Sequence, residues 1–304
     1  MQKNRIKKTD SMFRFMESLA GELRVLGRYR TSETYTSALN SFRKFRDGRD
    51  VPIGELDAAM MMSYEAYLKS RGLLANTTSF YMRILRAAYN RASELGLVSP
   101  GNPFRYVYTG VGRTVKRAVS LAEISRIREM PLPYRSTLDF ARDMFLFSFY
   151  TRGMPFVDMA YLRKKDLACG MLAYRRRKTG QLLRVRWESC MQDIVEKYQG
   201  GCASGIYLLP IITDAADERM RYLRMSHKVN RNLKTVGRMA SLEQPLTMYV
   251  ARHSWASAAR NKHIPLSVIS DGMGHESEHT TRIYLDSIDN SEIDMANKLI
   301  LSSL

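Results

Sequence analysis

Apolar side chains at helical spacing in the first hundred residues constrain the fold of this chain more than any other feature. In four separate stretches an apolar residue returns every three or four positions, which places the apolar residues on one face of an α-helix. The four stretches are marked by Phe15, Leu19, Leu23 and Leu26, by Tyr35, Leu39 and Phe42, by Met61, Tyr64 and Leu68, and by Tyr81, Leu85, Ala88, Ala92 and Leu95. Short amphipathic helices bury these faces by packing on one another, so we expect a four-helix domain.

Residues at the ends of the four stretches support this division. Thr31 or Ser32, Asp57 and Asn76 stand where a side-chain acceptor would satisfy the free N–H groups of a first helical turn. Gly72 and Gly96 stand where a helix commonly ends in the left-handed conformation. We therefore predict helix starts and ends at these positions.

A linker follows the four predicted helices. The segment 99–103 reads Ser-Pro-Gly-Asn-Pro and is followed by Gly, Arg and Lys residues, a composition typical of a connection between domains. Regular structure resumes at Ser120, which has capping-box spacing with Glu123. A length of 304 residues also favours two domains. The predicted organisation is a tail at 1–9, a helical domain at 10–110, a linker at 111–117 and a second domain at 118–304.

The second domain is expected to combine helices with a small antiparallel sheet. Strand-like runs at Met171–Arg176 and Leu182–Trp187 flank a turn-like stretch, which predicts a β-hairpin with Lys178 near its tip. Helices are expected at Leu138–Tyr150 and at about Pro155–Arg163, and most of the chain after the hairpin is also expected to be helical. The predicted fold class is mainly α, with an N-terminal four-helix domain and a C-terminal α+β domain.

The charge balance indicates a polyanionic partner. The chain has 48 Lys and Arg against 30 Asp and Glu, a formal net charge of +18. Residues 1–116 contain 20 basic and 10 acidic side chains, and residues 117–304 contain 28 and 20, so both halves are basic. A protein that holds a nucleic-acid duplex between two lobes needs phosphate contacts on each lobe. General solubility is the other explanation of such a charge.

The cysteines and the N-terminus bear on the compartment. The three cysteines are odd in number and lack CxxC spacing, which argues against a disulfide framework or a thiolate zinc site and favours a reducing compartment. The basic, polar first ten residues are not followed by the apolar segment of a signal peptide, and no apolar run is long enough for a membrane span. We expect a cytoplasmic protein with no membrane association.

Two short motifs precede a tyrosine at a defined distance. Residues 249–253 read Tyr-Val-Ala-Arg-His, residues 272–275 read Gly-Met-Gly-His, and Tyr284 follows His275 by nine positions. This order and spacing resembles the tyrosine recombinase and phage integrase family, which carries an H-x-x-R-H segment, an L-G-H segment and a nucleophilic tyrosine nine residues later. The resemblance extends over the whole chain, with a core-binding domain followed by a catalytic domain.

The resemblance implies a function and a set of site residues. Arg252 corresponds to the second catalytic arginine, His275 to the second histidine, Tyr284 to the nucleophile and Lys178 to the lysine of the hairpin. The implied enzyme is a site-specific DNA recombinase that cuts and rejoins strands through a 3′-phosphotyrosine. It would act as a homo-tetramer on double-stranded DNA sites, with no nucleotide or metal cofactor. The stretch 152–160 is similar to invertase-like members, which implies DNA inversion; accessory proteins and the target sequence are not indicated.

Two positions depart from the family pattern. Tyr249 stands in place of the first histidine, where a phenol could donate the same hydrogen bond to a phosphate. Pro155 stands in the column of the first catalytic arginine, and proline has no charge to offer. Arg152, in the same turn, is the preferred replacement, and Arg176 is the other candidate. These departures also motivate a second hypothesis, that the chain is a catalytically impaired DNA-binding relative of the recombinases.

A competing motif lies within the same region. Residues 275–279 read His-Glu-Ser-Glu-His, the HExxH pattern that holds zinc when it lies inside a helix. Gly272 and Gly274 just upstream favour a helix end there, and no third ligand is evident downstream. We therefore expect no metal at this position.

Overall fold

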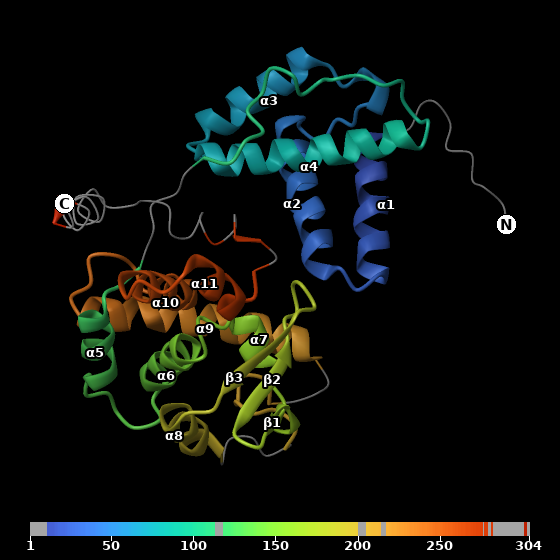
Figure 1. Ribbon diagram of the computed structural model, residues 1–304. Helices are drawn as coiled ribbons and strands as arrows, with labels where there is room; N and C mark the ends of the chain where they lie inside the picture. Colours follow the sequence, from blue (N-terminus) through green and yellow to red (C-terminus); the bar gives the residue numbers. More distant parts are fainter. Residues whose placement is uncertain are drawn as a thin grey trace. The chain divides into compact units, whose positions relative to one another are not determined.

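Two separate hydrophobic cores organise this chain. The structure, a computed structural model, describes residues 11–112, 118–199, 205–213, 217–275, 277–278, 281 and 301–302. The chain divides into two compact units, Met1–Thr114 and Val115–Leu304 (Figure 1). Each unit has its own core of buried apolar side chains. The predicted tail lies outside the described residues, as do positions 113–117 of the predicted linker.

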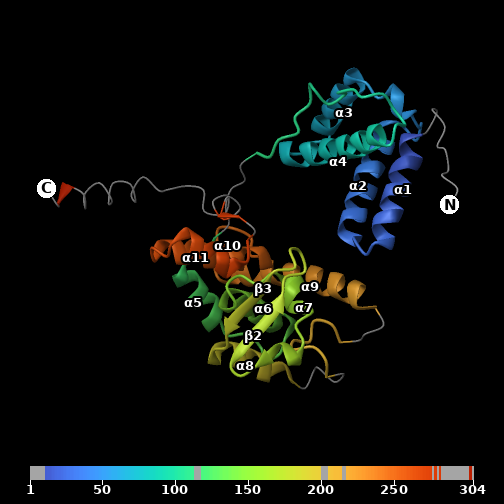
Figure 2. The same ribbon diagram turned by 45° about the vertical axis from the view of Figure 1, so that its right-hand side comes forward.

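The described residues of the N-terminal unit form four α-helices, as the apolar spacing predicted. They are α1 (Met12–Val25), α2 (Tyr29–Phe45), α3 (Ala58–Ser70) and α4 (Ala75–Glu94), with a short 3-10 helix, η1 (Ile53–Glu55), before α3. The α1 and α2 helices lie side by side, and α3 and α4 lie across one end of this pair (Figures 1 and 2). Phe42 and Tyr64 are fully buried where the helices meet, with ring centroids 5.1 Å apart.

The predicted helix ends of this unit are correct in part. Asp57 caps α3 by accepting from the Met60 N–H, and Gly72 and Gly96 have the expected positive φ after α3 and α4. The caps predicted at Thr31 or Ser32 and at Asn76 are wrong. Helix α2 begins at Tyr29 and α4 at Ala75 without a side-chain cap. The Ser32 hydroxyl instead donates to the Ala20 carbonyl, and the Asn76 side chain bonds the backbone of Gly112.

The C-terminal unit combines helices with a three-stranded antiparallel sheet. Within the described residues its elements are α5 (Leu121–Glu129), α6 (Thr137–Tyr150), α7 (Phe156–Ala160), η2 (Lys164–Asp166), β1 (Leu167–Ala168), β2 (Met171–Arg175), β3 (Leu182–Arg186), α8 (Ser189–Tyr198), α9 (Glu218–Met239), α10 (Met248–Asn261) and α11 (Leu266–Met273). Helix α6 is central and contacts α5, α8, α9 and α10. Ser120 and Glu123 form the predicted capping box at the start of α5. The predicted fold class is therefore confirmed.

The predicted β-hairpin is confirmed, and one strand was not predicted. Strands β2 and β3 pair antiparallel from Met171–Arg186 to Arg175–Leu182, which places Lys178 in the connecting turn. The edge strand β1 has only two residues, too few for an alternating pattern to mark it.

Helix α7 is shorter than the helix expected at about Pro155–Arg163. It ends at Ala160 because the following backbone pairs with a distant segment. The Leu162 carbonyl accepts from the Leu208 N–H at 2.8 Å, and Arg163 forms an isolated bridge with Tyr207. Within the described part of the chain, none of the helices has the length and apolar character that crossing a bilayer requires.

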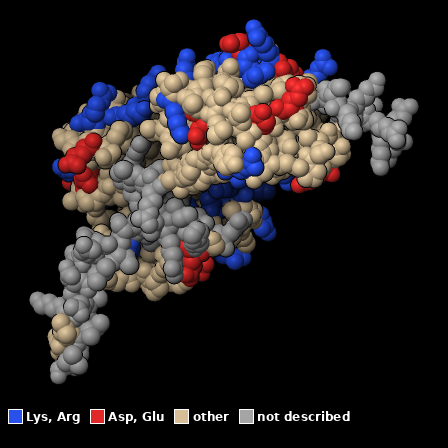
Figure 3. All heavy atoms as spheres, turned by 90° about the horizontal axis from the view of Figure 1, so that it is seen from above, with Lys and Arg blue, Asp and Glu red and all other residues tan. Residues whose placement is uncertain are grey.

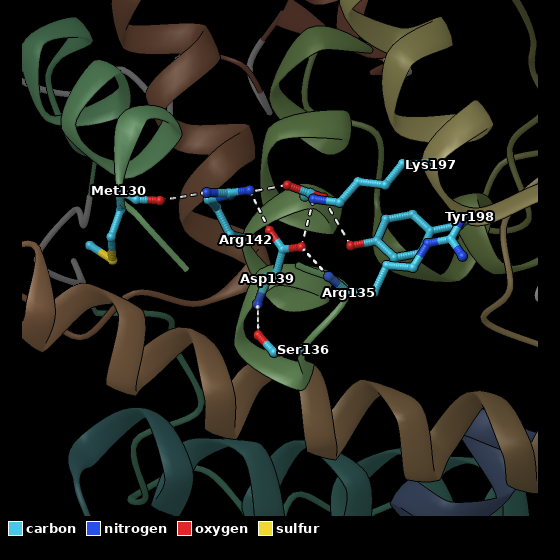
Figure 4. Close-up of polar contacts among 8 residues, drawn as sticks. Met130, Arg135, Ser136, Asp139, Arg142, Lys197 and Tyr198 are labelled. Atoms are coloured by element: carbon cyan, nitrogen blue, oxygen red, sulfur yellow. Dashed lines mark hydrogen bonds and ion pairs between the residues drawn. The ribbon is translucent and has the colours of Figure 1, made fainter. Parts of the chain in front are cut away.

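A buried ionic network joins α6 to α8 (Figure 4). Asp139 and Asp143 lie one turn apart on α6, and Lys197 Nζ of α8 lies 2.6 Å from a carboxylate oxygen of each. Arg142 forms ion pairs with both carboxylates and donates to the Met130 carbonyl at 2.8 Å. Because the two acids are almost fully buried, each cation offsets a charge that water does not reach. The network holds α6 in place, and the end of α6 leads into the candidate active site.

Candidate active site

Arg252 lies at the centre of the candidate active site. It is on α10, and its side chain is directed into the protein with only 5% of the residue exposed. Its Nη1 donates to the Gly153 carbonyl at 2.8 Å, and its Nη2 donates to the Met273 carbonyl and to His275 Nε2, each at 2.8 Å. The guanidinium therefore joins the turn after α6 to the end of α11.

His275 follows the left-handed Gly274 that ends α11. The residue is 9% exposed, its backbone N–H donates to the Ser270 carbonyl, and its Nδ1 lies 2.7 Å from Thr281 Oγ1. Because arginine can only donate, Nε2 is the acceptor and the ring proton lies on Nδ1, directed to Thr281. Burial, with added repulsion from the Arg252, Arg176 and Lys178 charges, lowers the pKa of His275 to about 4. The imidazole is therefore neutral near pH 7.

Replacement of His275 by Gln should make the C-terminal unit less sensitive to acid. Below pH 6.5 the unfolded chain gains a proton on this histidine that the folded protein does not accept until about pH 4, so falling pH favours unfolding. At pH 5 this linkage removes about 2 kcal/mol from the wild-type protein and nothing from His275→Gln. Both tryptophans, Trp187 and Trp255, lie in this unit, so urea unfolding followed by tryptophan fluorescence at pH 7 and pH 5 measures the difference. An equal loss of stability in the two proteins would contradict it.

Gly153 and Arg152 form the turn between α6 and α7. Gly153 has φ +73°, and a Cβ there would lie 2.7 Å from the Arg252 Cα, so only glycine fits against α10. Arg152 also has a positive φ, of 63°, and is half-buried. Its Cδ lies 3.7 Å from the position that a Cβ on Gly272 would occupy. The turn thus brings Arg152 next to α11, one residue from the carbonyl that Arg252 binds.

Lys178 and Arg176 reach the site from the hairpin. Lys178 is exposed in the turn between β2 and β3, and its charge acts on His275. Arg176 is 6% exposed, and its Nη1 donates to the Gly274 carbonyl. Its Nε lies 3.8 Å from Asp158 Oδ2 of α7. Burial raises the pKa of Asp158 even though three guanidinium groups oppose the shift.

The structure does not bring all six predicted residues together. Tyr249 is 56% exposed on α10, while Arg252 of the same helix is buried; the Tyr249 ring makes an edge-to-face contact with His253, with centroids 4.5 Å apart. Tyr284 lies outside the described residues. So do Glu276 and His279 of the HExxH motif. Among the described residues, no group of three His, Cys, Asp or Glu could hold a metal ion.

Sequence reasoning missed two residues of this site. Asp158 accepts from the Arg177 N–H at 2.9 Å and faces Arg176, so it ties α7 to the hairpin. A signal was present, because Asp158 is a lone acid within the otherwise apolar run 154–162, but it was not used. Thr281 bonds His275, and nothing in its sequence context marks it.

Comparisons with known proteins match both units. Residues 11–106 match the Phage integrase SAM-like domain family, and residues 211–291 match the Phage integrase family. The chain is also 21% identical over 280 residues to a protein of Pseudothermotoga lettingae named Tyrosine recombinase. This match covers 89% of the present chain and 92% of the relative. The chain belongs to the tyrosine recombinase family.

Solved structures agree with the fold of this recombinase-family chain. A lambda integrase dimer bound to a COC′ core site has a TM-score of 0.69 at 14% identity and covers 90% of this chain and 95% of that chain. The Tn1549 transposon integrase in complex with transposon right-end DNA gives 0.67 at 14% identity, with coverages of 96% and 100%. The XerH site-specific recombinase bound to difH in a pre-cleavage complex gives 0.65 at 14% identity, with 94% of each chain covered. The family carries out site-specific recombination and generally transfers DNA strands.

Proposed function

We propose that this protein is an active site-specific DNA recombinase that forms a 3′-phosphotyrosine at Tyr284 and inverts a DNA segment. The observation that carries the proposal is the buried contact between Arg252 and His275, 2.8 Å from Nη2 to Nε2. These two residues lie 23 positions apart and are two of the four to which the resemblance assigned catalytic roles. A cation held against a neutral imidazole in a buried site is suited to binding a phosphodiester and accepting a proton beside it.

In the proposed cleavage step the Tyr284 oxygen attacks the scissile phosphorus. The bond from this oxygen to phosphorus forms as the bond from phosphorus to the 5′ oxygen breaks. A phenol with a pKa near 10 needs a base, and the neutral His275 offers Nε2. The phosphate competes for the Arg252 donor, which frees Nε2 to accept the phenolic proton. Lys178 donates a proton to the departing 5′ oxygen. Because the new ester keeps the bond energy, a second 5′ hydroxyl reverses the step.

Arg152 is proposed to supply the guanidinium that Pro155 lacks. It lies in the turn whose glycine carbonyl is bound by Arg252, and arginine keeps its charge at any relevant pH. Arg152→Ala should slow strand cleavage by at least about 10²-fold, as the loss of one donor to a transition-state oxyanion does. DNA binding, measured by mobility shift, should stay within about threefold of wild type because other basic contacts persist. A variant that cleaves at the wild-type rate would refute this role.

The N-terminal unit is proposed to hold the duplex. A groove of about 610 Å³ runs along α2, with the hydroxyl and amide side chains of Ser37 and Asn40 in its wall and Arg24, Lys44 and Arg71 around it. Amide groups can read base edges, and cations can bind the flanking phosphates. On the face shown in Figure 3, Lys and Arg side chains are more widespread than Asp and Glu. Residues 10–110 would thus bind DNA and residues 118–304 would bind and cleave it.

Inversion and a tetrameric assembly belong to the same proposal. One of the solved structures similar to this chain is a lambda integrase tetramer bound to a Holliday junction. Four protomers of the present protein on two sites would exchange the strands in two steps. A plasmid carrying two inverted copies of the target site should change the orientation of the intervening segment, which polymerase chain reaction across one site detects. With two sites in direct orientation, the segment between them would instead be excised.

A catalytically impaired DNA-binding protein is the second candidate function. The observations that favour it are Pro155, in the column of the first arginine, and the exposed Tyr249, in the column of the first histidine. Such a protein would bind the same sites without forming a covalent bond.

Covalent capture from genomic DNA tests the proposal and separates the two candidates. The purified protein is mixed with sheared DNA of its source genome in EDTA, treated with sodium dodecyl sulfate, and the DNA that stays attached is sequenced. The recombinase proposal requires discrete sites linked through a 3′ phosphate, without any metal. A nicked duplex built on these sites then traps the adduct for rate measurements. Site-specific binding in a mobility shift without any detergent-resistant adduct would favour the impaired relative.

A further inference from the structure

Arg176 is a buried cation to which the proposed mechanism gives no role. It directly follows β2, and it closes the turn of the hairpin: its N–H donates to the Gln181 carbonyl at 2.9 Å and its carbonyl accepts from the Gly180 N–H at 2.8 Å. Lys178 lies in this turn, two residues further on. The Arg176 backbone therefore helps to fix the turn that carries Lys178, and the Arg176 side chain links this turn to the Gly274 carbonyl.

Two arginines from different elements bind consecutive carbonyls before His275. Arg252 of α10 binds the Met273 carbonyl, and Arg176 of the hairpin binds the Gly274 carbonyl. A Cβ on Gly274 would come within 2.8 Å of the Arg176 Cδ, so the glycine allows the arginine stem to pass close to the backbone. The peptide that leads into His275 is thus the meeting point of α10, α11 and the hairpin.

Asp158 holds the other side of the turn. It accepts from the Arg177 N–H at 2.9 Å and lies 3.8 Å from Arg176 Nε. A planar guanidinium can direct Nε to this carboxylate while Nη1 binds the Gly274 carbonyl, whereas a lysine has a single ammonium group. His275 keeps three other contacts, with Ser270, Thr281 and Arg252, so its position depends less on Arg176 than the turn does.

We propose that Arg176 is a positioning residue that fixes the hairpin turn, and with it Lys178, against the Gly274 carbonyl, so that the proton donor is in register with the site of Arg252 and His275. The inference rests on the proposed function and deepens it. The Arg176 guanidinium is turned toward the Gly274 carbonyl and the Asp158 carboxylate, and Arg152 keeps the role of binding the phosphate. Loss of Arg176 should therefore impair protonation of the leaving group and spare the attack on phosphorus.

Two versions of the trapped substrate test this division. One has the ordinary 5′ oxygen, and the other has a bridging 5′ sulfur, which leaves without a proton. With the oxygen substrate, Arg176→Gln and Arg176→Lys should each slow adduct formation about 10- to 100-fold, as a small misplacement of a catalytic group does. With the sulfur substrate, the rates of both variants and of Lys178→Ala should lie within about threefold of the wild-type rate. The departing sulfur needs no proton, so a displaced or missing Lys178 has little effect.

A double variant and a neighbouring control complete the test. Arg176→Gln combined with Lys178→Ala should be no slower on the oxygen substrate than Lys178→Ala by itself, because both changes remove one step. Arg184→Gln, which removes an exposed charge on β3, should react on both substrates within about threefold of wild type. Equal slowing of Arg176 variants on both substrates, or additive losses in the double variant, would overturn the proposal. No adduct from the wild-type protein on either substrate would instead overturn the proposed function itself.

Arg176→Gln could fail to fold, which loss of DNA binding in a mobility shift would show. Arg176→Lys is then compared with the wild type by the ratio of its rate on the sulfur substrate to its rate on the oxygen substrate. It retains the positive charge and loses only the fork that reaches the carbonyl and the carboxylate together. A sulfur-to-oxygen rate ratio that rises at least about tenfold over wild type supports the proposal, and an unchanged ratio overturns it.

Discussion

Tyr284→Phe should form no covalent adduct with the nicked substrate. The substitution removes one oxygen atom, the one proposed to bond to phosphorus, and phenylalanine offers no other nucleophile. We expect adduct formation to fall by more than about 10⁴-fold, below detection on a denaturing gel, as loss of a catalytic nucleophile does. DNA binding in a mobility shift should stay within about threefold of wild type because the phosphate contacts remain.

Two further variants make this result specific. Tyr134→Phe removes the hydroxyl of another tyrosine, which is exposed in the same unit, and should leave the rate unchanged. Tyr249→Phe removes the hydrogen bond that a phenol in the histidine position could give to the phosphate, and should slow the reaction about 10²-fold without abolishing it. An adduct that persists in Tyr284→Phe would mean that another residue is the nucleophile.

The second large effect is on stability and concerns the ionic network in Figure 4. Lys197→Met should reduce the free energy of unfolding of the C-terminal unit by about 3 kcal/mol, because Asp139 and Asp143 would remain buried with only Arg142 to offset two charges. Urea unfolding followed by tryptophan fluorescence reports this unit. Because α6 ends three residues before Gly153, weaker packing of α6 in Lys197→Met should also slow DNA cleavage.

The control is an exposed ion pair in the same unit. Arg126→Met breaks the pair with Glu123 on α5 and should change stability by less than about 0.5 kcal/mol, because the pair lies at the surface, with the Arg126 side chain 56% and the Glu123 side chain 29% exposed. Asp143→Asn combined with Lys197→Met should recover at least about 1 kcal/mol relative to Lys197→Met, since one carboxylate charge is removed and Arg142 then offsets only the charge of Asp139. A Lys197→Met protein as stable as Arg126→Met would show that the network contributes nothing.

Features that depend on neighbouring residues could be predicted from the sequence. The apolar spacing of Phe42, Tyr64 and Leu85 marks helices that bury these residues. The Ser120 and Glu123 cap, the Asp57 cap and the hairpin around Lys178 also follow from residues close together in the chain. Predictions failed where a side chain or backbone group forms its hydrogen bond with a residue distant in the sequence. Asn76 bonds Gly112 instead of capping a helix, and pairing with 207–208 ends α7 early.

The candidate site divides along the same line. Motif spacing selected Arg252 and His275, which the structure places in contact, and the roles assigned to the six predicted residues stay predictions. The motifs gave no reason to include Asp158 or Thr281, and they left two candidates for the missing arginine, with Arg152 preferred to Arg176. Burial and partners distinguish the two further, since Arg176 binds the Gly274 carbonyl and Arg152 is half-buried beside α11.

By itself, then, the order of residues determined the helical and hairpin elements, the division into two basic halves and the family, because periodicity, capping and motif spacing are properties of the chain. The tertiary structure decided which guanidinium binds which carbonyl and which histidine tautomer is present. Those choices depend on groups that are brought together from 153, 176, 252 and 274, where burial removes water and leaves each donor only its protein partner.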